Sequence, residues 1–390
     1  MICKNCILDN DSCKITFDEK GVCNYCNDYS NFEKKLPNKE NRVNKLENLI
    51  SKIKFAGRRK KYDCIIGLSG GVDSSYLAYL AVKKFGLKPL AVHFDNGWNS
   101  DLAVTNVNHI VDILKLDLIT YVIEWEEFRD LQLAYIRAAV VDLEVPTDHF
   151  IFATMYKYAK KHGIKYILNG SNYQTEFIMP VGWNFNHKLD LKNLLDIHKR
   201  FGTKKLSNYP KLGFWQRIKY KIIHRIVEVS PLSLTDYNIR EVKLLLKEKL
   251  RWKDYGGKHH ESVWTRFYQG YILPKKYNID KRKAHLSNLI CSGQLSRKEA
   301  LEKLEKNTYT EGLQEKDKIY VLKKLGLSED DFGEYINGVC REHDEFLTET
   351  KLVSFESNFL QIIDGFCHYA VRPIELLKFI KYKFHRLIYE

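Results

Sequence analysis

Long apolar runs are missing from this sequence. No stretch approaches the roughly 20 consecutive apolar residues of a membrane-spanning helix. The first ten residues, MICKNCILDN, also lack the basic segment and apolar stretch of a secretory signal peptide. Apolar residues make up 44% and charged residues 29% of the 390 residues, as in soluble globular proteins. We therefore expect a cytoplasmic protein of two or three domains.

A lysine is missing from the most glycine-rich motif, GLSGGVDSS at residues 67–75. The motif suits a phosphate-binding loop, because Gly70 and Gly71 let the backbone approach a ligand and a following helix start favours an anion. It departs from the Walker pattern, which requires Gly-Lys-Ser/Thr. The motif therefore does not favour transfer of a γ-phosphoryl group. The plain alternative is a strand–helix turn capped by Ser and Asp.

Short apolar runs alternate with helical patterns in the first half of the chain. This alternation predicts an α/β fold with a doubly wound parallel sheet, whose ligands bind at the carboxyl ends of the strands. We expect strands at 62–68, 89–95, 118–124 and 164–170, and helices at 74–86, 101–116 and 148–163, the last capped by Asp148 and stopped by Gly163. Beyond about residue 180 the pattern becomes mainly helical, in particular at 236–252 and 296–390. The predicted domains are 1–35, 36–200 and 201–390.

The Ser-Gly-Gly-Val-Asp-Ser string at a strand–helix junction resembles the loop of the PP-loop ATP pyrophosphatase superfamily. Members of that superfamily cleave ATP between its α- and β-phosphates, and the loop holds the pyrophosphate. The resemblance implies an adenylating enzyme and a set of ATP-binding residues at strand ends. These are Ser69, Gly70, Gly71, Val72, Asp73, Ser74, Ser75, His93, Phe94, Asp95, Asn96 and Gly170.

Nine cysteines are present, and five of them fall within the first 26 residues. Cys3 and Cys6 form one CxxC pair, and Cys23 and Cys26 form a second. This spacing is typical of a zinc ribbon with four thiolates around one structural Zn²⁺. An iron–sulfur cluster is a lesser alternative. The remaining cysteines, which include a spare one in the ribbon, are expected to be unliganded: Cys13, Cys64, Cys291, Cys340 and Cys367.

A long polar and aromatic stretch at 255–301 indicates which family of this superfamily the sequence resembles. Together with the cysteine pairs, SGGVDSS and FDNGWNS, it resembles the N-acetyl sugar amidotransferases of lipopolysaccharide and nonulosonic-acid biosynthesis, over roughly residues 1–310. These enzymes convert an acetamido group into an acetamidino group. The resemblance implies that the amide oxygen attacks the α-phosphorus of ATP, and that ammonia then displaces AMP.

The resemblance also implies roles for charged residues. Mg²⁺ and the loop amides would screen the phosphates, with Ser69 and Asp73 in the loop. Lys258, Arg266, Lys281 and Arg282 are candidates for the leaving pyrophosphate or for a sugar-nucleotide diphosphate. Exposed loop charges are the alternative for each. Candidates for the sugar or for proton transfer are His259, His260, Glu261, Thr265, Tyr268 and Gln269.

A source of ammonia is not recognisable in the chain. Residue 2 is Ile, so an N-terminal cysteine nucleophile is absent, and no glutaminase module is evident. The family draws ammonia from a separate glutaminase and a cyclase-like barrel, similar to the two subunits of imidazole glycerol phosphate synthase. The resemblance therefore implies such a partner complex.

Positive charge is concentrated at residues 199–225, which hold nine Lys or Arg and no Asp or Glu, against a net charge of +14 for the chain. Aromatic residues are interleaved with these charges. An RNA-binding surface, an anionic membrane surface and a docking face are alternatives to a solvated helix and loop. Nucleic acid is the least favoured partner.

Two other functions share part of this pattern. A tRNA-thiolating PP-loop enzyme would have the same loop, cysteine pairs and positive charge. Against it, Cys291 is the only cysteine near the 255–301 stretch and has no close partner in sequence. A non-catalytic nucleotide-binding subunit is the second alternative, and the complete loop argues against it.

Overall fold

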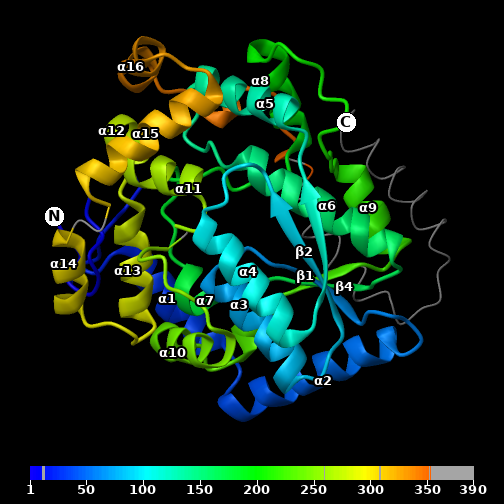
Figure 1. The fold of residues 1–390 in the computed structure, drawn as a ribbon. Helices are drawn as coiled ribbons and strands as arrows, with labels where there is room; N and C mark the ends of the chain where they lie inside the picture. The colour runs from blue at the N-terminus through cyan, green and yellow to red at the C-terminus, as the bar shows by residue number, and fades with distance from the viewer. Residues whose placement is uncertain (11–13, 259, 307–308, 351, 353–390) are drawn as a thin grey trace, which may run out of the picture.

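The computed structural model describes residues 1–10, 14–258, 260–306, 309–350 and 352. Five parallel strands form one sheet in the order β3-β2-β1-β4-β5. The sheet lies at the centre of the molecule (Figure 1). Its strands are β1 (Cys64–Gly67), β2 (Pro89–Asp95), β3 (Asp117–Val122), β4 (Tyr166–Leu168) and β5 (Val227–Val229). The predicted doubly wound α/β fold is confirmed.

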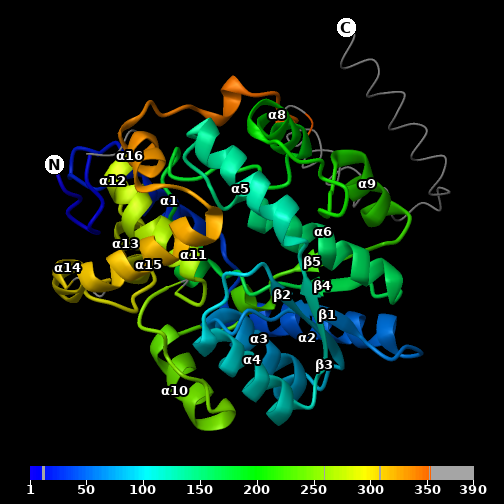
Figure 2. The ribbon, with the colours of Figure 1, turned by 45° about the horizontal axis from the view of Figure 1, so that its top comes forward.

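Strand alternation divides the core between the two faces of the sheet, because successive side chains point in opposite directions. Cys64 and Ile66 of β1 pack with the helices α2 (Lys39–Gly57), α3 (Val72–Tyr79), α4 (Asp101–Leu114) and α10 (Ile239–Leu250). Ile65 packs on the other face, against α6 (Val145–Lys161) and the segment that follows α9 (Phe214–Ile222). Figure 2 shows these two layers on either side of the sheet. The central strands β1 and β2 are mainly buried apolar runs, as expected for a sheet covered on both faces, whereas the edge strands β3 and β5 are partly exposed.

The helices alternate with the strands in the first half and dominate the second. Those of the α/β layer are α1 (Asn24–Lys35), α2 (Lys39–Gly57), α3 (Val72–Tyr79), α4 (Asp101–Leu114), α5 (Trp125–Ala138), α6 (Val145–Lys161), α7 (Tyr173–Glu176), α8 (Leu191–Phe201) and α9 (Phe214–Ile222). The later helices are α10 (Ile239–Leu250), α11 (Val263–Phe267), α12 (Leu273–Tyr277), α13 (Lys281–Cys291), α14 (Arg297–Glu305), α15 (Glu311–Leu325) and α16 (Glu329–Asn337). Short π-helical turns occupy Leu80–Lys84 and Tyr268–Ile272, and 3₁₀ turns occupy Pro231–Leu234 and His343–Glu345.

A second and larger core joins the N-terminal cysteines to the helical half. It contains apolar residues of α5, α11, α13 and α15, and buried Cys3 and Cys26 belong to it. Figure 1 shows the blue N-terminal segment beside the yellow α13 and α14. Residues almost 300 positions apart in sequence are therefore neighbours here.

Some local predictions differ from the structure. Helix α6 starts at Val145 rather than after Asp148, because Pro146 occupies its first turn, a position where a missing backbone N–H costs nothing. Gly163 does follow the helix in a left-handed conformation, with φ of +64°. Strand β5 was not predicted, because it is only three residues long and follows the basic stretch. The sheet therefore continues past residue 200, and the predicted division into domains stays a prediction.

Some predictions concern residues that the structure does not describe. Cys13, His259, Cys367 and most of the helical prediction beyond residue 350 lie outside the described residues. Within the described part of the chain, no helix combines the length and apolar character needed to cross a membrane.

Candidate active site

The loop between β1 and α3 lies at the carboxyl end of the central strand. Hydrogen bonds within the loop fix its shape: Gly71 N donates to Ser69 Oγ at 3.1 Å, and the hydroxyls of Ser69 and Ser74 are 3.1 Å apart. Ser75 donates to the Gly71 carbonyl at 2.5 Å. Ser69 is exposed, so its hydroxyl can reach a ligand. The start of an eight-residue helix follows directly, as in anion-binding loops.

The two glycines of the loop have different physical roles. Gly70 has φ of +78°, and a β-carbon there would lie 2.5 Å from the carbonyl oxygen of Ala103 on α4. Gly71 has an ordinary φ of −71°. A β-carbon at Gly71 would instead lie 3.0 Å from Ser69 Oγ and 3.0 Å from Glu261 Oε1. The fold therefore requires glycine at 70, whereas glycine at 71 keeps open the space between the loop and Glu261.

Two aromatic side chains hold the loop from behind, and sequence reasoning did not identify either. The indole N–H of Trp252 donates to the Gly70 carbonyl at 2.8 Å. The Tyr255 hydroxyl accepts from Val72 N at 3.0 Å, so this predicted phosphate-binding amide already has a partner. Both aromatic residues follow α10, far from the loop in sequence, and no short-range pattern signals them.

Asp73 is tied to two neighbouring segments. Its Oδ1 accepts hydrogen bonds from the Tyr237 hydroxyl and, at 3.3 Å, from the Asn172 amide. Burial, and next the Asp73 charge, raise the pKa of Tyr237, so this phenol stays a donor near neutral pH. Gly170 packs just as closely, since a β-carbon there would lie 3.2 Å from Asp73 Cβ and 3.3 Å from Ser74 N. The carboxyl ends of β1 and β4 thus meet at Asp73.

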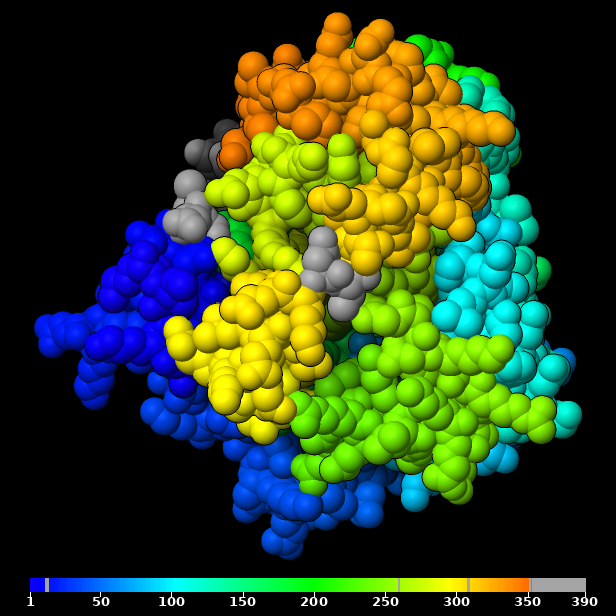
Figure 3. Space-filling view, turned by 60° about the vertical axis from the view of Figure 1, so that its left-hand side comes forward, coloured from blue at the N-terminus to red at the C-terminus, as the bar shows by residue number. Residues whose placement is uncertain are grey.

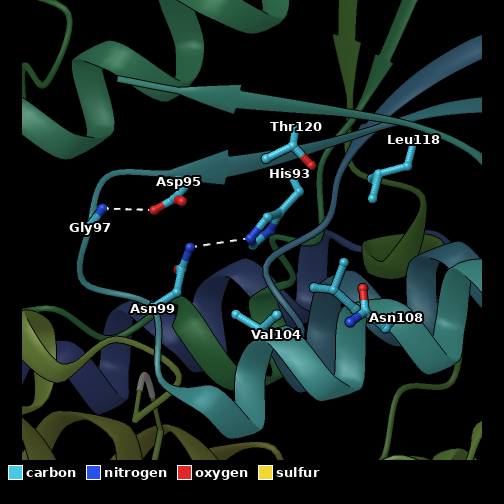
Figure 4. A pocket seen from close by; sticks show the side chains of 9 residues that line it. His93, Asp95, Gly97, Asn99, Val104, Asn108, Leu118 and Thr120 are labelled. Carbon is cyan, nitrogen blue, oxygen red and sulfur yellow. Dashed lines mark hydrogen bonds between the residues drawn. The ribbon is translucent and has the colours of Figure 1, made fainter. Parts of the chain in front are cut away.

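The end of β2 opens onto a cleft of about 270 Å³ between β3 and α4, drawn in Figure 4. His93 points into it, with Nδ1 2.9 Å from the Leu68 carbonyl and Nε2 3.2 Å from the Asn99 amide. Asp95 also lines the cleft, and its Oδ1 accepts from Gly97 N at 2.9 Å. Phe94 points to the opposite face of the sheet, where its ring meets Phe150.

Asn96 stabilises the turn after β2. Its side-chain oxygen accepts from Trp98 N at 3.2 Å, and the side chain is buried. Of the four residues predicted at this strand end, His93 and Asp95 therefore line the cleft, whereas Phe94 and Asn96 face protein.

The predicted basic residues are dispersed. Lys258 lies next to α7, with Nζ 3.0 Å from Glu176 Oε1, at the carboxyl edge of the sheet. Arg266 forms a bidentate ion pair with Asp317 of α15, at 2.7 and 2.8 Å. Arg282 pairs with Asp280, which caps its own helix. In this conformation Arg266 and Arg282 are held by carboxylates of the protein itself.

The space in front of the loop is bounded by α11 and its preceding residues. Asn99 and Ser262 form a β-bridge, and Glu261 reaches the loop beside Gly71. Figure 3 shows a hollow between the green surface around α10 and the yellow surface of α13 and α14. The beginning of the 255–301 stretch therefore lies against the glycine loop.

A buried ionic cluster lies behind α11. Asp142 is fully buried and accepts from Lys188 at 2.6 Å and from Phe185 N at 2.8 Å. Although burial opposes its ionisation, the Lys188 and Lys281 charges bring the pKa of Asp142 to about 2. Glu144 accepts from the Thr265 hydroxyl at 3.0 Å through Oε2. Burial, and next the Asp148 charge, raise the pKa of Glu144 to about 7.

Sequence reasoning selected only two members of this cluster, Thr265 and Lys281. Lys281 is buried, and burial lowers its pKa. The available signal for the others was the acidic segment DLEVPTD at 142–148. Its acidic residues are typical of an exposed helix start, and nothing in the sequence showed that they are buried.

The four predicted metal ligands converge at the N-terminus. The Sγ atoms of Cys3, Cys6, Cys23 and Cys26 all lie within 4.8 Å of one another, and all four residues are buried. The separations are 3.9 Å for Cys3–Cys26 and 3.7 Å for Cys6–Cys23. Four thiolates around one tetrahedral Zn²⁺ would be about 3.8 Å apart, given Zn–S bonds of about 2.3 Å. The residues present therefore fit this ion.

The cysteine cluster is attached to the helical half. Arg297 donates to the carbonyls of Cys6 at 3.0 Å and Cys3 at 3.2 Å. Cys291 of α13 lies with its Sγ 3.6 Å from that of Cys26. Cys291, the cysteine within the 255–301 stretch, thus belongs to the surroundings of the cluster and not to the glycine loop.

The basic stretch forms a separate surface. Lys199, Lys204, Lys205 and Lys211 line an open cleft of about 480 Å³ together with the end of α8. Lys204 pairs with Glu126 at 2.7 Å, and Lys211 donates to the Leu206 carbonyl. Tyr209 and Phe214 of the stretch are buried, whereas Trp215 is exposed. The aromatic residues are thus divided between core and surface.

The parallel sheet, with a glycine loop between its central strand and an eight-residue helix, has the arrangement expected of a PP-loop nucleotide-binding domain. In agreement, residues 61–171 match the asparagine synthase family. Residues 261–359 match the family described as LPS biosynthesis protein WbpG-like, C-terminal domain. Together the two matches support an LPS-biosynthesis amidotransferase family within the PP-loop superfamily, the family that the sequence resembles.

Individual relatives are distant. An uncharacterized protein of Methanocaldococcus jannaschii is 25% identical over 317 residues, which cover 78% of this chain and 94% of that protein. Among solved structures, NMN synthetase from Francisella tularensis is 18% identical, with a TM-score of 0.29, over 55% of this chain and 96% of the other. NH3-dependent NAD synthetase from Campylobacter jejuni is 16% identical, with a TM-score of 0.29, over 56% and 90%.

Proposed function

We propose that the protein is an ATP-dependent amidotransferase that converts the acetamido group of an N-acetyl sugar into an acetamidino group. The supporting observation is the meeting of two segments. The loop of Gly70 and Gly71, which suits a leaving pyrophosphate, faces Glu261 at the start of the region that matches an LPS-biosynthesis family. The sugar is carried by a nucleotide, because a diphosphate would account for basic residues such as Lys258 near this edge.

The reaction has two steps. First, the amide oxygen attacks the α-phosphorus of ATP, the bond to pyrophosphate breaks, and an O-adenylyl imidate forms. Second, ammonia adds to the imidate carbon and AMP leaves. The Ser69 hydroxyl and the start of α3 would bind the departing pyrophosphate, and Asp73, which Tyr237 and Asn172 hold in position, would bind Mg²⁺. The cleft beside His93 would hold the adenosine.

The cysteine cluster holds Zn²⁺ in this proposal and has a structural role. Four thiolates leave no open coordination position, and the cluster is joined to α13 and α14 rather than to the loop. Reduced thiols and ATP both fit a cytoplasmic enzyme. Cys291, which lies beside Cys26, and Cys64, which is buried in the sheet, give no support to thiolation of tRNA.

Ammonia comes from a separate glutaminase and a cyclase-like barrel subunit in this proposal. An adenylyl imidate is prone to hydrolysis, and delivery through a docked, water-excluding path favours amidation. The basic cleft near Lys205 is one surface on which such a partner can dock, and its positive charge would require an acidic partner surface.

The test is mass spectrometry on a panel of nucleotide-linked N-acetyl sugars incubated with ATP, Mg²⁺ and ammonium. One sugar should lose mass by the difference between O and NH, with equal amounts of AMP and pyrophosphate formed. Unchanged masses across the panel, together with modification of tRNA in a parallel incubation, would refute the proposal.

A further inference from the structure

Two buried charged residues behind α11, Glu144 and Lys281, lie within electrostatic range of each other without being paired. Glu144 Oε1 has no hydrogen-bond partner among the described residues, although Oε2 is bonded to Thr265. The Lys281 ammonium makes no hydrogen bond or ion pair with the described residues, and its Nζ lies 5.6 Å from the centroid of the Tyr268 ring. Glu144 is 9% and Lys281 7% exposed. Most buried polar groups in native structures have a hydrogen-bond partner, so an unpaired one calls for an explanation, such as a molecule that binds there.

The other charges of this region are already satisfied. Lys188 pairs with Asp142 at 2.6 Å and with Asp148 at 2.9 Å. The Tyr268 hydroxyl donates to the Val141 carbonyl at 2.6 Å. Five groups face Glu144 from the elements around it: Asp142 before α6, Asp148 on α6, Lys188 before α8, Thr265 on α11 and Lys281 on α13. An unused acceptor on Glu144 and an unused donor on Lys281 are left over.

This pair lies close to the glycine loop. Glu261, next to the helix cap Ser262, reaches Gly71, and Thr265 stands about one helical turn further on, a rise of roughly 5.4 Å. Thr265 in turn contacts Glu144. A small group held between Glu144 and Lys281 would therefore lie within a few side-chain lengths of a phosphate chain bound at the loop.

A secondary amide offers what these two residues lack. Its N–H is a donor for the free oxygen of Glu144, and its carbonyl is an acceptor for Lys281. We propose that Glu144 and Lys281 bind the acetamido group of the substrate, Glu144 at the amide N–H and Lys281 at the amide oxygen. This inference rests on the proposed function, because it assigns the reacting group of that substrate to a place in the fold.

Glu144 would also accept and return the proton that the reaction releases. When the amide oxygen forms its bond to the α-phosphorus, and the bond to pyrophosphate breaks, the amide N–H becomes acidic. Glu144 Oε1 takes this proton and leaves a neutral imidate. Glu144 then returns the proton to the imidate nitrogen as ammonia adds to the carbon. The C–O bond breaks with its electron pair, and the departing AMP oxygen takes one proton from the added nitrogen, which leaves an amidinium. A carboxyl group whose pKa is raised to about 7 suits both transfers.

The direct test uses two small probes that differ only at nitrogen. N-methylacetamide has an amide N–H, whereas N,N-dimethylacetamide has the same carbonyl and none. In protein labelled with carbon-13 at glutamate carboxyls, the Glu144 signal is the one missing from Glu144→Gln. We expect N-methylacetamide to shift this signal and to bind at least severalfold more tightly than N,N-dimethylacetamide. Equal effects of the two probes, or no effect of either, would overturn the inference.

Variants separate the two contacts. Glu144→Gln should abolish the discrimination between the probes, and Lys281→Gln should weaken both probes alike. Thr265→Val removes the hydroxyl on the other oxygen and should keep the discrimination. Glu126→Gln is the matched surface control, because Glu126 is half exposed and paired with Arg129 and Lys204. If Glu126→Gln also lost the discrimination between the two probes, the discrimination would not depend on Glu144, and the proposed site would be refuted.

Turnover distinguishes this inference from the proposed function. If the wild-type protein converts a sugar of the panel, Glu144→Gln should lower kcat at least tenfold and flatten its pH profile near neutrality. Unchanged kcat in that variant would overturn the inference and leave the proposed function standing. If the wild-type protein converts no sugar, the proposed function fails, and the two probes still decide whether Glu144 and Lys281 bind an amide.

Discussion

Gly70 and Gly71 allow the fold and the ATP site to be tested separately. Gly71 has an ordinary φ, and alanine there would meet only side-chain oxygens at 3.0 Å. We expect Gly71→Ala to cost about 0.5–1 kcal/mol of stability, as for alanine at a helix N-cap. The same methyl group would obstruct an anion at the loop. Loss of one hydrogen bond to a charged group, about 1.5–3 kcal/mol, corresponds to roughly 10–100-fold weaker Mg·ATP binding.

Gly70→Ala should mainly destabilise the fold, in contrast to Gly71→Ala. Its φ of +78° costs an alanine about 1–2 kcal/mol, and its β-carbon would lie 2.5 Å from the Ala103 carbonyl oxygen. We therefore expect a loss of about 2 kcal/mol or more in the free energy of unfolding, or a fall in Tm of about 4 °C or more.

The assay measures Tm for both variants without ligand, and the Kd of Mg·ATP by isothermal titration calorimetry. Gly71→Ala should keep nearly the wild-type Tm and lose affinity for ATP, and Gly71→Val should abolish turnover. If Gly71→Ala bound ATP with the wild-type Kd, the assignment of this loop as the phosphate site would be wrong. A wild-type Tm for Gly70→Ala would refute the steric argument.

Four further results are expected. Asp73→Ala should abolish turnover while circular dichroism shows an intact fold; near-native amidination would remove Asp73 from the site. Elemental analysis should find about one Zn²⁺ per chain, which Cys23→Ser releases with loss of N-terminal stability; a metal-free variant with full activity would contradict this. The protein alone should use ammonium, best at alkaline pH, and not glutamine until a glutaminase and barrel partner are added; robust glutamine use by the isolated chain would mean that the partner is unnecessary. Because the folded-state pKa of Glu144 is about 7 against an ordinary 4.5, the wild-type protein should lose about 3 kcal/mol of stability relative to Glu144→Gln as pH rises from 4.5 through 7, and parallel Tm curves would exclude the shift.

The sequence predicted the parts of the fold and site that local patterns encode. The apolar run of β2 was predicted with the bounds that the structure has, and the spacing of the four cysteines predicted their cluster. The glycine loop was recognised because its residues are consecutive in sequence.

Contacts between distant segments could not be predicted in the same way. Trp252 and Tyr255 hold the loop from more than 180 residues away, and no local periodicity marks them. In the sequence, Glu144 cannot be distinguished from an exposed glutamate at the start of a helix. Only the tertiary packing shows that it is buried. Arg266 was a candidate for phosphate because it is basic, and its bidentate contact with Asp317 depends on how α15 packs on α11.

The central claim is that the acetamido oxygen attacks the α-phosphorus of ATP. The most direct measurement uses the sugar that the panel identifies, labelled with oxygen-18 in its acetamido carbonyl, and incubated with the protein, ATP, Mg²⁺ and ammonium. Mass spectrometry of the products should find the label in AMP, with none in pyrophosphate and none left in the amidine sugar. An unlabelled AMP, with the label in inorganic phosphate or retained in the sugar, would contradict adenylation of the amide oxygen.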